Sequence, residues 1–178
     1  MRSVFFSDLH LMKDDRGAES YFLSFIDEIG DGADRLYILG DLFEFCFGKG
    51  GHIYPWFREV FRAFERLAAQ GTKIFFLEGN HEFFMEGFGT AGPVTFIRTL
   101  SETIGGTSVF LSHGHEFTSP FLNGLLRSSL VSSLMTALGP DRTWQAAMVW
   151  RRILSQKEKG YDQSVRPVFR RYAERKFS

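Results

Sequence analysis

The chain has 178 residues, a formal net charge of zero and 44% hydrophobic residues, which is enough apolar material for about one domain with a core of its own. This balance excludes a disordered chain and a uniformly basic nucleic-acid-binding protein, so nucleic acid is not an expected partner. A single cysteine, Cys46, excludes an internal disulfide framework and indicates a reducing compartment.

Signals for export or membrane insertion are not expected in this sequence. Residues 1–3 lead directly into an apolar stretch, which leaves no room for the apolar core of a signal peptide. No run approaches the roughly 18 apolar residues that a membrane-spanning helix needs. We therefore expect a cytoplasmic protein.

The first two thirds of the chain alternate short apolar runs with amphipathic stretches. The predicted strands cover residues 4–6, 36–39, 73–77 and 108–111. The predicted helices are one that ends at Gly30, one that spans residues 55–70 and one that spans residues 93–104, with Ile97, Leu100 and Ile104 facing inward. This alternation predicts an α/β fold, with a mostly parallel sheet flanked by helices.

The remainder of the chain is predicted to be helical and basic. Three helical stretches follow residue 120: one that stops at Gly139-Pro140, one over residues 144–154 and one over residues 165–173. Residues 1–117 carry 17 acidic and 10 basic side chains, whereas residues 118–178 carry 4 acidic and 11 basic ones. We therefore expect an acidic α/β core over 1–117 and a basic helical insertion or lid over 118–178.

Each of the four predicted strands ends in side chains that can bind metal. Asp8 and His10 follow the first strand, Asp41 the second, Asn80 the third and His113 the fourth. One such ending alone is weak evidence, because Asp and His often close strands as turn formers. If the four strands lie side by side, the five side chains converge at the carboxyl edge of the sheet. The set then predicts a site for two cations, with Asp41 bridging them.

The donor types indicate the metal and the reaction. Carboxylate, amide and imidazole groups without a thiolate suit Mn²⁺, Fe²⁺ or Zn²⁺, with manganese the first choice. Two such ions about 3.5–4 Å apart can activate water and hold the attacking and leaving oxygens of a displacement at phosphorus. His81 is predicted to be a catalytic residue facing the departing or non-bridging oxygen; the alternative is that His81 orients a ligand. His115 could be a ligand, a substrate contact or a loop residue, and the last two are favoured together.

The motifs that carry these residues resemble those of a known family. Asp8-x-His10, Gly40-Asp41, Gly79-Asn80-His81-Glu82 and His113-Gly114 look like the motif series of the calcineurin-like metallophosphoesterases. Residues 8–11 and 40–44, with the helical insertion after Gly114, are similar to the UDP-2,3-diacylglucosamine diphosphatases of lipid A biosynthesis. The family's final Gly-His-x-His motif is absent. The resemblance therefore implies the first part of an α/β/β/α sandwich, without two of the expected ligands.

The resemblance also implies a substrate. It is UDP-2,3-diacylglucosamine, whose pyrophosphate would be hydrolysed to UMP and the acylated sugar 1-phosphate. The basic helical part offers Arg127, Arg151 and Arg152 for phosphate, and Leu122, Leu126, Trp144 and Met148 for acyl chains. The alternative is that these leucines form core and these arginines a solvated face. A basic amphipathic helix could also rest peripherally on the inner membrane surface.

Two other functions fit the same residues. One is a generic metallophosphodiesterase or nucleotidase on the same scaffold. The other is a catalytically silent module that binds a partner, because the last two ligand histidines of the family are missing. Metal content and turnover distinguish an enzyme from a silent module.

Overall fold

The computed structural model describes residues 1–30, 32–49, 54–88, 92–115, 124 and 127–155. The chain divides into two compact units, Met1–His113 and Gly114–Ser178. The first unit contains, in order, β1 (Ser3–Phe6), α1 (Arg16–Gly30), β2 (Arg35–Ile38), β3 (Cys46–Phe47), η1 (Pro55–Phe57), α2 (Arg58–Ala69), β4 (Lys73–Leu77), β5 (Glu82–Phe83), η2 (Met85–Phe88), β6 (Val94–Ile97), β7 (Thr99–Ile104) and β8 (Thr107–Ser112).

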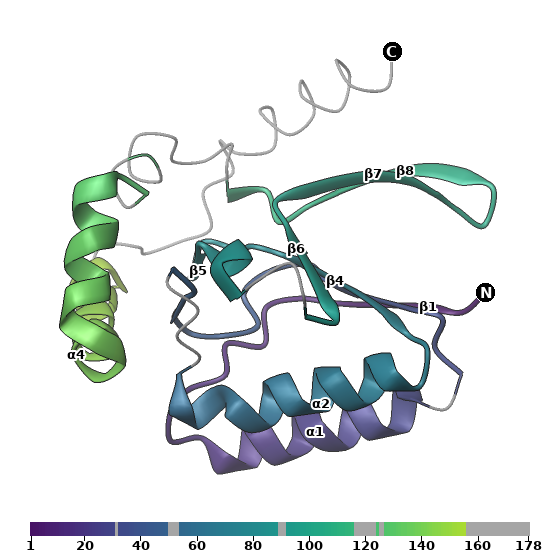
Figure 1. Ribbon diagram of the computed structural model, residues 1–178, viewed down its shortest axis with the longest axis horizontal. Coiled ribbons are helices and arrows are strands. Elements are labelled where there is room, and N and C mark those ends of the chain that lie inside the picture. The colour runs from purple at the N-terminus through teal and green to yellow at the C-terminus, as the bar shows by residue number, and fades with distance from the viewer. Residues whose placement is uncertain (31, 50–53, 89–91, 116–123, 125–126, 156–178) are drawn as a thin grey trace. The chain divides into compact units, whose positions relative to one another are not determined.

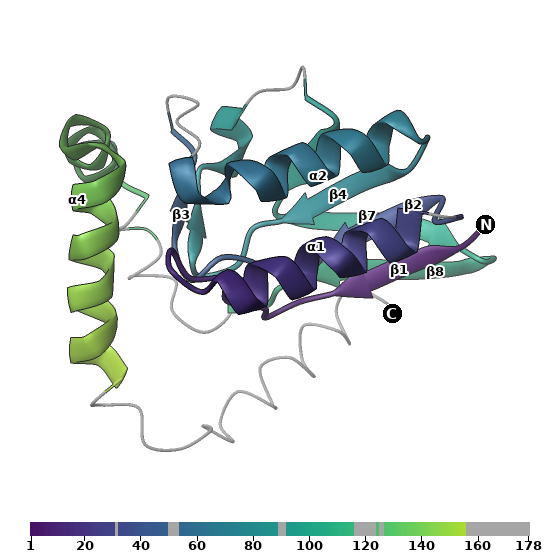
Figure 2. The same ribbon diagram turned by 90° about the horizontal axis from the view of Figure 1, so that it is seen from below.

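The centre of the first unit is a four-stranded sheet with the order β1-β2-β4-β6. All of its neighbouring strands are parallel. Helices α1 and α2 lie side by side on one face of this sheet, and the β7–β8 hairpin lies over the other face (Figures 1 and 2). The predicted α/β fold with a mostly parallel sheet is confirmed. Because the strands are parallel, their carboxyl ends share one edge of the sheet.

The core fills the layer between the sheet and the two helices. Leu36, Ile38, Ile74 and Phe76 of the sheet are buried there, and α1 contributes Phe22 and Ile26. Helix α2 buries Val60, Phe61, Phe64 and Leu67 along one side. The rings of Phe5, Tyr37 and Phe75 stack across three strands on the opposite face, with centroids 4.6 and 5.2 Å apart. The chain has 21 phenylalanines, and some of them therefore pack on both faces of one sheet.

The prediction of a helix over residues 93–104 was wrong. The structure has strands β6 and β7 there, joined at Arg98. Ile97, Leu100 and Ile104 recur at helical spacing, but valine, threonine and isoleucine dominate the segment, and β-branched residues favour extended backbone. Pairing of β6 with β4 decides the outcome, since Ile74 lies beside Val94 and Phe76 beside Phe96.

The predicted strand over residues 108–111 exists as β8, but its expected place in the parallel sheet was wrong. It pairs antiparallel with β7 in a separate two-stranded sheet. β6 takes the fourth place in the parallel sheet instead. A two-residue connection at Gly105 and Gly106, both with positive φ, is the short turn that joins antiparallel neighbours.

The second unit contains α4 (Ser129–Ser155), which is interrupted at Gly139. Gly139 has φ 74° and ψ 174°, and Pro140 follows it, so two helices meet there as predicted. The predicted helical stretch over residues 165–173 lies outside the described residues. Among the residues that the structure describes, we find no helix with the length and apolar character needed to cross a bilayer.

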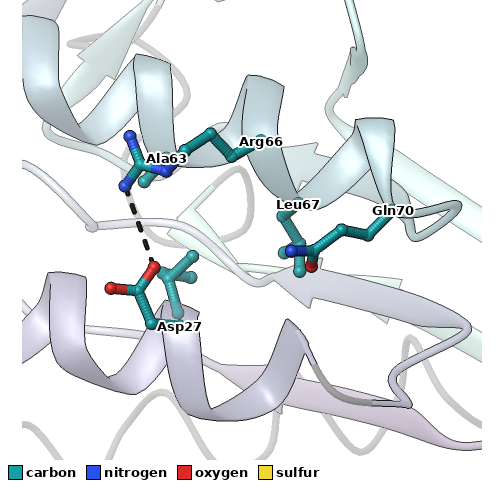
Figure 3. A pocket seen from close by; sticks show the side chains of 6 residues that line it. Asp27, Ala63, Arg66, Leu67 and Gln70 are labelled. Carbon is teal, nitrogen blue, oxygen red and sulfur yellow. Dashed lines mark ion pairs between the residues drawn. The ribbon is translucent and has the colours of Figure 1, made fainter.

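A small groove lies between α1 and α2. Its cavity of about 110 Å³ is lined by Ile26, Asp27, Ala63, Arg66, Leu67 and Gln70. Arg66 of α2 reaches across to Asp27 of α1, with 3.8 Å between Nη2 and Oδ1 (Figure 3). None of the metal-capable side chains predicted from the sequence lines this groove.

Candidate metal centre

The turns that follow β1 and β2 hold three of the predicted ligands in an unusual backbone conformation. Asp8, His10 and Asp41 have φ of 59°, 50° and 53°, in the left-handed region that side-chain-bearing residues seldom occupy. Hydrogen bonds between the two turns stabilise this backbone conformation. One of them runs from the N–H of His10 to the Asp41 carbonyl, at 3.0 Å. Backbone strain of this kind concentrates at functional sites.

Two glycines let the turns approach closely. A Cβ on Gly79 would lie 2.0 Å from Oδ1 of Asp41, and a Cβ on Gly40 would lie 2.6 Å from Nδ1 of His113. Gly40 also has φ of 91°, which favours glycine. The chain therefore needs glycine at both positions to bring Asp41 and His113 together.

Three histidines point the same ring nitrogen at one carboxylate. The Nε2 atoms of His10, His81 and His113 lie 3.8, 3.9 and 3.3 Å from Oδ2 of Asp41. Their Nδ1 atoms face other acceptors: the Leu39 carbonyl at 2.8 Å from His113, the Glu44 carbonyl at 2.7 Å from His81 and the Glu44 carboxylate at 3.4 Å from His10. For His81 and His113, the hydrogen bond at Nδ1 favours the neutral tautomer that leaves Nε2 free of its proton and able to bind a metal.

These side chains form two groups that could each hold an ion. His10, Asp41 and His81 form one group, and Asp8, Asp41 and His113 form the other, with the ligand atoms of each group within 4.8 Å of one another. Two donors about 2.1 Å from a common ion lie at most about 4.2 Å apart. The three Asp41–histidine distances meet this limit, so the donor set fits divalent ions, and Asp41 is common to both groups.

Asn80 joins the second group. Its Oδ1 lies 3.1 Å from Nε2 of His113, on the turn that follows β4. The structure thus brings together all five predicted ligands and His81, all within the first unit. It does so although β8, which carries His113 at its end, is not part of the parallel sheet.

The charges within the centre stabilise one another without a metal. Burial opposes ionisation of Asp41, but the hydrogen bond and charge of His113, with His81, lower the pKa of Asp41 below its usual value. Burial also opposes protonation of His113, but the hydrogen bond and charge of Asp41 raise the pKa of His113 to about 9. The metal-free centre is therefore an Asp41–His113 ion pair at neutral pH.

We predict that the metal-free protein loses stability between pH 6.5 and pH 9. The folded-state pKa of His113 lies above the ordinary histidine value of 6.5, so the ion pair contributes fully below pH 6.5 and is lost as pH rises through about 9. Thermal unfolding of EDTA-treated protein across this range measures the effect. Glu82, whose pKa is also raised, acts in the same direction, so His113→Gln isolates the contribution of the histidine. Parallel profiles for wild type and His113→Gln would contradict the prediction.

Two buried glutamates shape the centre and were not predicted as site residues. Glu44 contacts His10 through its carboxylate and His81 through its carbonyl oxygen. Glu82 accepts backbone N–H groups of Asp41, Phe43 and Gly79. Burial, with repulsion from Asp41, raises the pKa of Glu82 to about 8, against the effect of these donors. The sequence offered one signal for both residues: Glu44 and Glu82 each lie next to phenylalanines in a site motif. A glutamate that is buried with such neighbours needs polar partners, which here belong to the centre.

The predicted substrate residues all belong to the second unit or to segments outside the described residues. Arg151 and Arg152 are exposed and Arg127 and Met148 are partly buried. Trp144 and His115 are buried. Leu122 and Leu126 lie outside the described residues. The roles of these residues stay predictions.

Comparison with known proteins identifies the family. The family model described as calcineurin-like phosphoesterase matches residues 1–173. The chain belongs to the calcineurin-like phosphoesterase family. The two candidate ion groups at the carboxyl edge of its parallel sheet lie within the matched region.

Relatives of this family member include proteins named UDP-2,3-diacylglucosamine hydrolase. The one from Chromohalobacter salexigens is 30% identical over 151 residues, which are 84% of this chain and 58% of the relative. The one from Azotobacter vinelandii is 34% identical over 158 residues, which are 85% of this chain and 65% of the relative. The one from Aeromonas salmonicida is 34% identical over 116 residues, which are 64% of this chain and 45% of the relative. The chain thus spans less than two thirds of the length of these relatives.

Proposed function

We propose that this chain is a two-metal phosphoester hydrolase, with Asp8, His10, Asp41, Asn80 and His113 as ligands. The observation that carries the proposal is that Asp41 belongs to both candidate ion groups, as a bridging carboxylate must. Divalent ions bound there, Mn²⁺ by our preference, would supply Lewis-acid charge and activate water for attack at phosphorus. The same donors leave Fe²⁺ and Zn²⁺ as alternatives.

In this proposal the chain's own residues position the substrate and move a proton. His81 is held by its Nδ1 at the Glu44 carbonyl, so its Nε2 faces the centre. As an imidazolium, the ring can donate its Nε2 proton to the departing oxygen. The backbone N–H of His81 donates to Oδ1 of Asp41 at 3.1 Å, which fixes the histidine beside the ligand. The geometry also suits His81 as a ligand, since it lies in the group with His10 and Asp41.

We propose UDP-2,3-diacylglucosamine as the substrate, with UMP and the acylated sugar 1-phosphate as products. The names of the relatives from Chromohalobacter and Azotobacter support this choice. The second unit supports an amphiphilic substrate, because α4 exposes Leu130, Leu134, Val149 and Trp150 beside exposed arginines. Such a surface can contact acyl chains or a membrane surface.

We predict Mn²⁺-dependent hydrolysis that favours the acylated UDP-sugar over an unacylated UDP-sugar by at least about tenfold, the effect of 1.4 kcal/mol of apolar contact. Release of UMP from the two substrates, with and without EDTA, is the measurement. Equal rates would remove the lipid substrate and leave the generic phosphodiesterase. Less than half a metal per chain and no turnover, even of a nitrophenyl phosphodiester, would favour the silent binding module.

A further inference from the structure

Glu82 links the two turns that carry the bridging carboxylate and the amide ligand. Its side chain is fully buried, at 0% exposed. Oε2 accepts the N–H of Asp41 at 2.8 Å and the N–H of Gly79 at 2.8 Å, and Oε1 accepts the N–H of Phe43 at 3.0 Å. One carboxylate thus joins the turn after β2 to the turn after β4, which lie about 40 residues apart in the sequence.

Oε2 of Glu82 lies at the close contact between the two turns. Gly79 is so close to Asp41 that a Cβ on it would lie 2.5 Å from the Asp41 nitrogen, and Oε2 of Glu82 accepts both N–H groups at this contact. The N–H of Asp41 belongs to a residue with φ of 53°. A side-chain oxygen that accepts this N–H favours the strained conformation over its relaxed alternatives.

Backbone pairing fixes the position of Glu82 itself. It lies in β5, which pairs parallel with β3 so that Glu82 lies beside Cys46. The N–H of Cys46 donates to the His81 carbonyl at 2.9 Å, and the N–H of Gly48 donates to the Phe83 carbonyl at 2.8 Å. The carboxylate therefore acts from a fixed backbone, as a residue that orients metal ligands requires.

We propose that Glu82 is a positioning residue, which sets the backbone of Asp41 so that one carboxylate faces both ion positions. The proposal rests on the proposed two-metal function. It assigns Glu82 no contact with metal or substrate. Its effect passes through the N–H groups of Asp41 and Gly79, so loss of Glu82 should weaken both ion positions together.

The isosteric variant Glu82→Gln tests this role. Its side chain has one oxygen and one NH₂ group, so in either orientation an NH₂ group faces at least one of the three backbone N–H donors. We expect Mn²⁺ to bind roughly 10- to 100-fold more weakly at both positions, as for other residues that orient metal ligands. Titration followed by electron paramagnetic resonance measures the affinity and the coupling of the two ions.

Glu78→Gln is the matched control. Glu78 is almost as buried, at 1% exposed, but it accepts the N–H of Met85 at 2.6 Å and faces Arg98. Its loss should lower the melting temperature without changing Mn²⁺ affinity. A similar loss of affinity in both variants, or wild-type affinity in Glu82→Gln, would overturn the positioning role.

Amide hydrogen exchange in the metal-free proteins separates failure of this proposal from failure of the proposed function. We expect the amides of Asp41, Phe43 and Gly79 to lose protection in Glu82→Gln and to keep it in Glu78→Gln. Unchanged protection in Glu82→Gln would overturn the link between the turns even if Mn²⁺ binding fell. A wild-type protein that keeps this protection but binds no Mn²⁺ would refute the two-metal function and, with it, the positioning role.

Discussion

We expect Asp41→Ala to abolish binding at both ion positions together and to lower phosphoesterase activity by on the order of a thousandfold or more. A metal's charge is worth several kcal/mol to the transition state, and each 1.4 kcal/mol is about tenfold in rate. The reason for the joint loss is that Asp41 is the one residue shared by the two candidate ion groups among the described residues. Metal content per chain after dialysis against Mn²⁺, with the rate of UMP release, measures both effects.

Asn80→Ala and Asp27→Ala complete this test. Oδ1 of Asn80 lies against Nε2 of His113, which belongs to the group with Asp8, so loss of Asn80 should weaken that group and spare the group with His10. Asp27 pairs with Arg66 on the helical surface, so its loss should leave both ions bound. An Asp41→Ala protein that keeps one full equivalent of Mn²⁺ would show that the two positions do not share a ligand.

The second large effect is expected from Gly79→Ala, which removes no donor. The added Cβ would lie 2.0 Å from Oδ1 of Asp41, so the turn or the carboxylate has to shift. A displacement of about 1 Å at a reacting centre can cost about a hundredfold in rate. We expect a loss of activity of that size, with weaker Mn²⁺ binding, in steady-state assays and metal titrations.

Gly92→Ala is the matched control for this prediction. A Cβ on Gly92 meets no atom of the described residues within 4 Å, and its φ lies outside the left-handed region. The two variants add the same methyl group, but only the one on Gly79 would contact Asp41 of the metal centre. Full activity of Gly79→Ala would contradict the close approach of the two turns, and an equal loss in Gly92→Ala would point to a general effect of alanine on folding.

Much of the fold could be predicted because the strands of a parallel sheet are buried on both faces and appear as short apolar runs. The runs at Leu36 and Ile74 are examples, and both became strands of the central sheet. The segment around Ile97 was mispredicted because its apolar residues fit a helical period while their β-branched neighbours fit a strand. Only the long-range pairing of β6 with β4 settles that ambiguity.

The ligands of the candidate centre could be predicted because each closes a strand. His113 reached the centre for a different reason from the one expected, since β8 lies outside the parallel sheet and its end still places the ring 3.3 Å from Asp41. The roles of Glu44 and Glu82 could not be predicted in the same way. They depend on where backbone N–H groups and imidazole Nδ1 atoms point after folding, which no local pattern specifies.

Anomalous diffraction from a crystal grown with Mn²⁺ tests the central claim most directly. We predict two manganese peaks about 3.5–4 Å apart, with Asp41 between them, His10 at one peak and His113 at the other. A single peak, or two peaks in separate cavities with Asp41 touching at most one, would contradict the account.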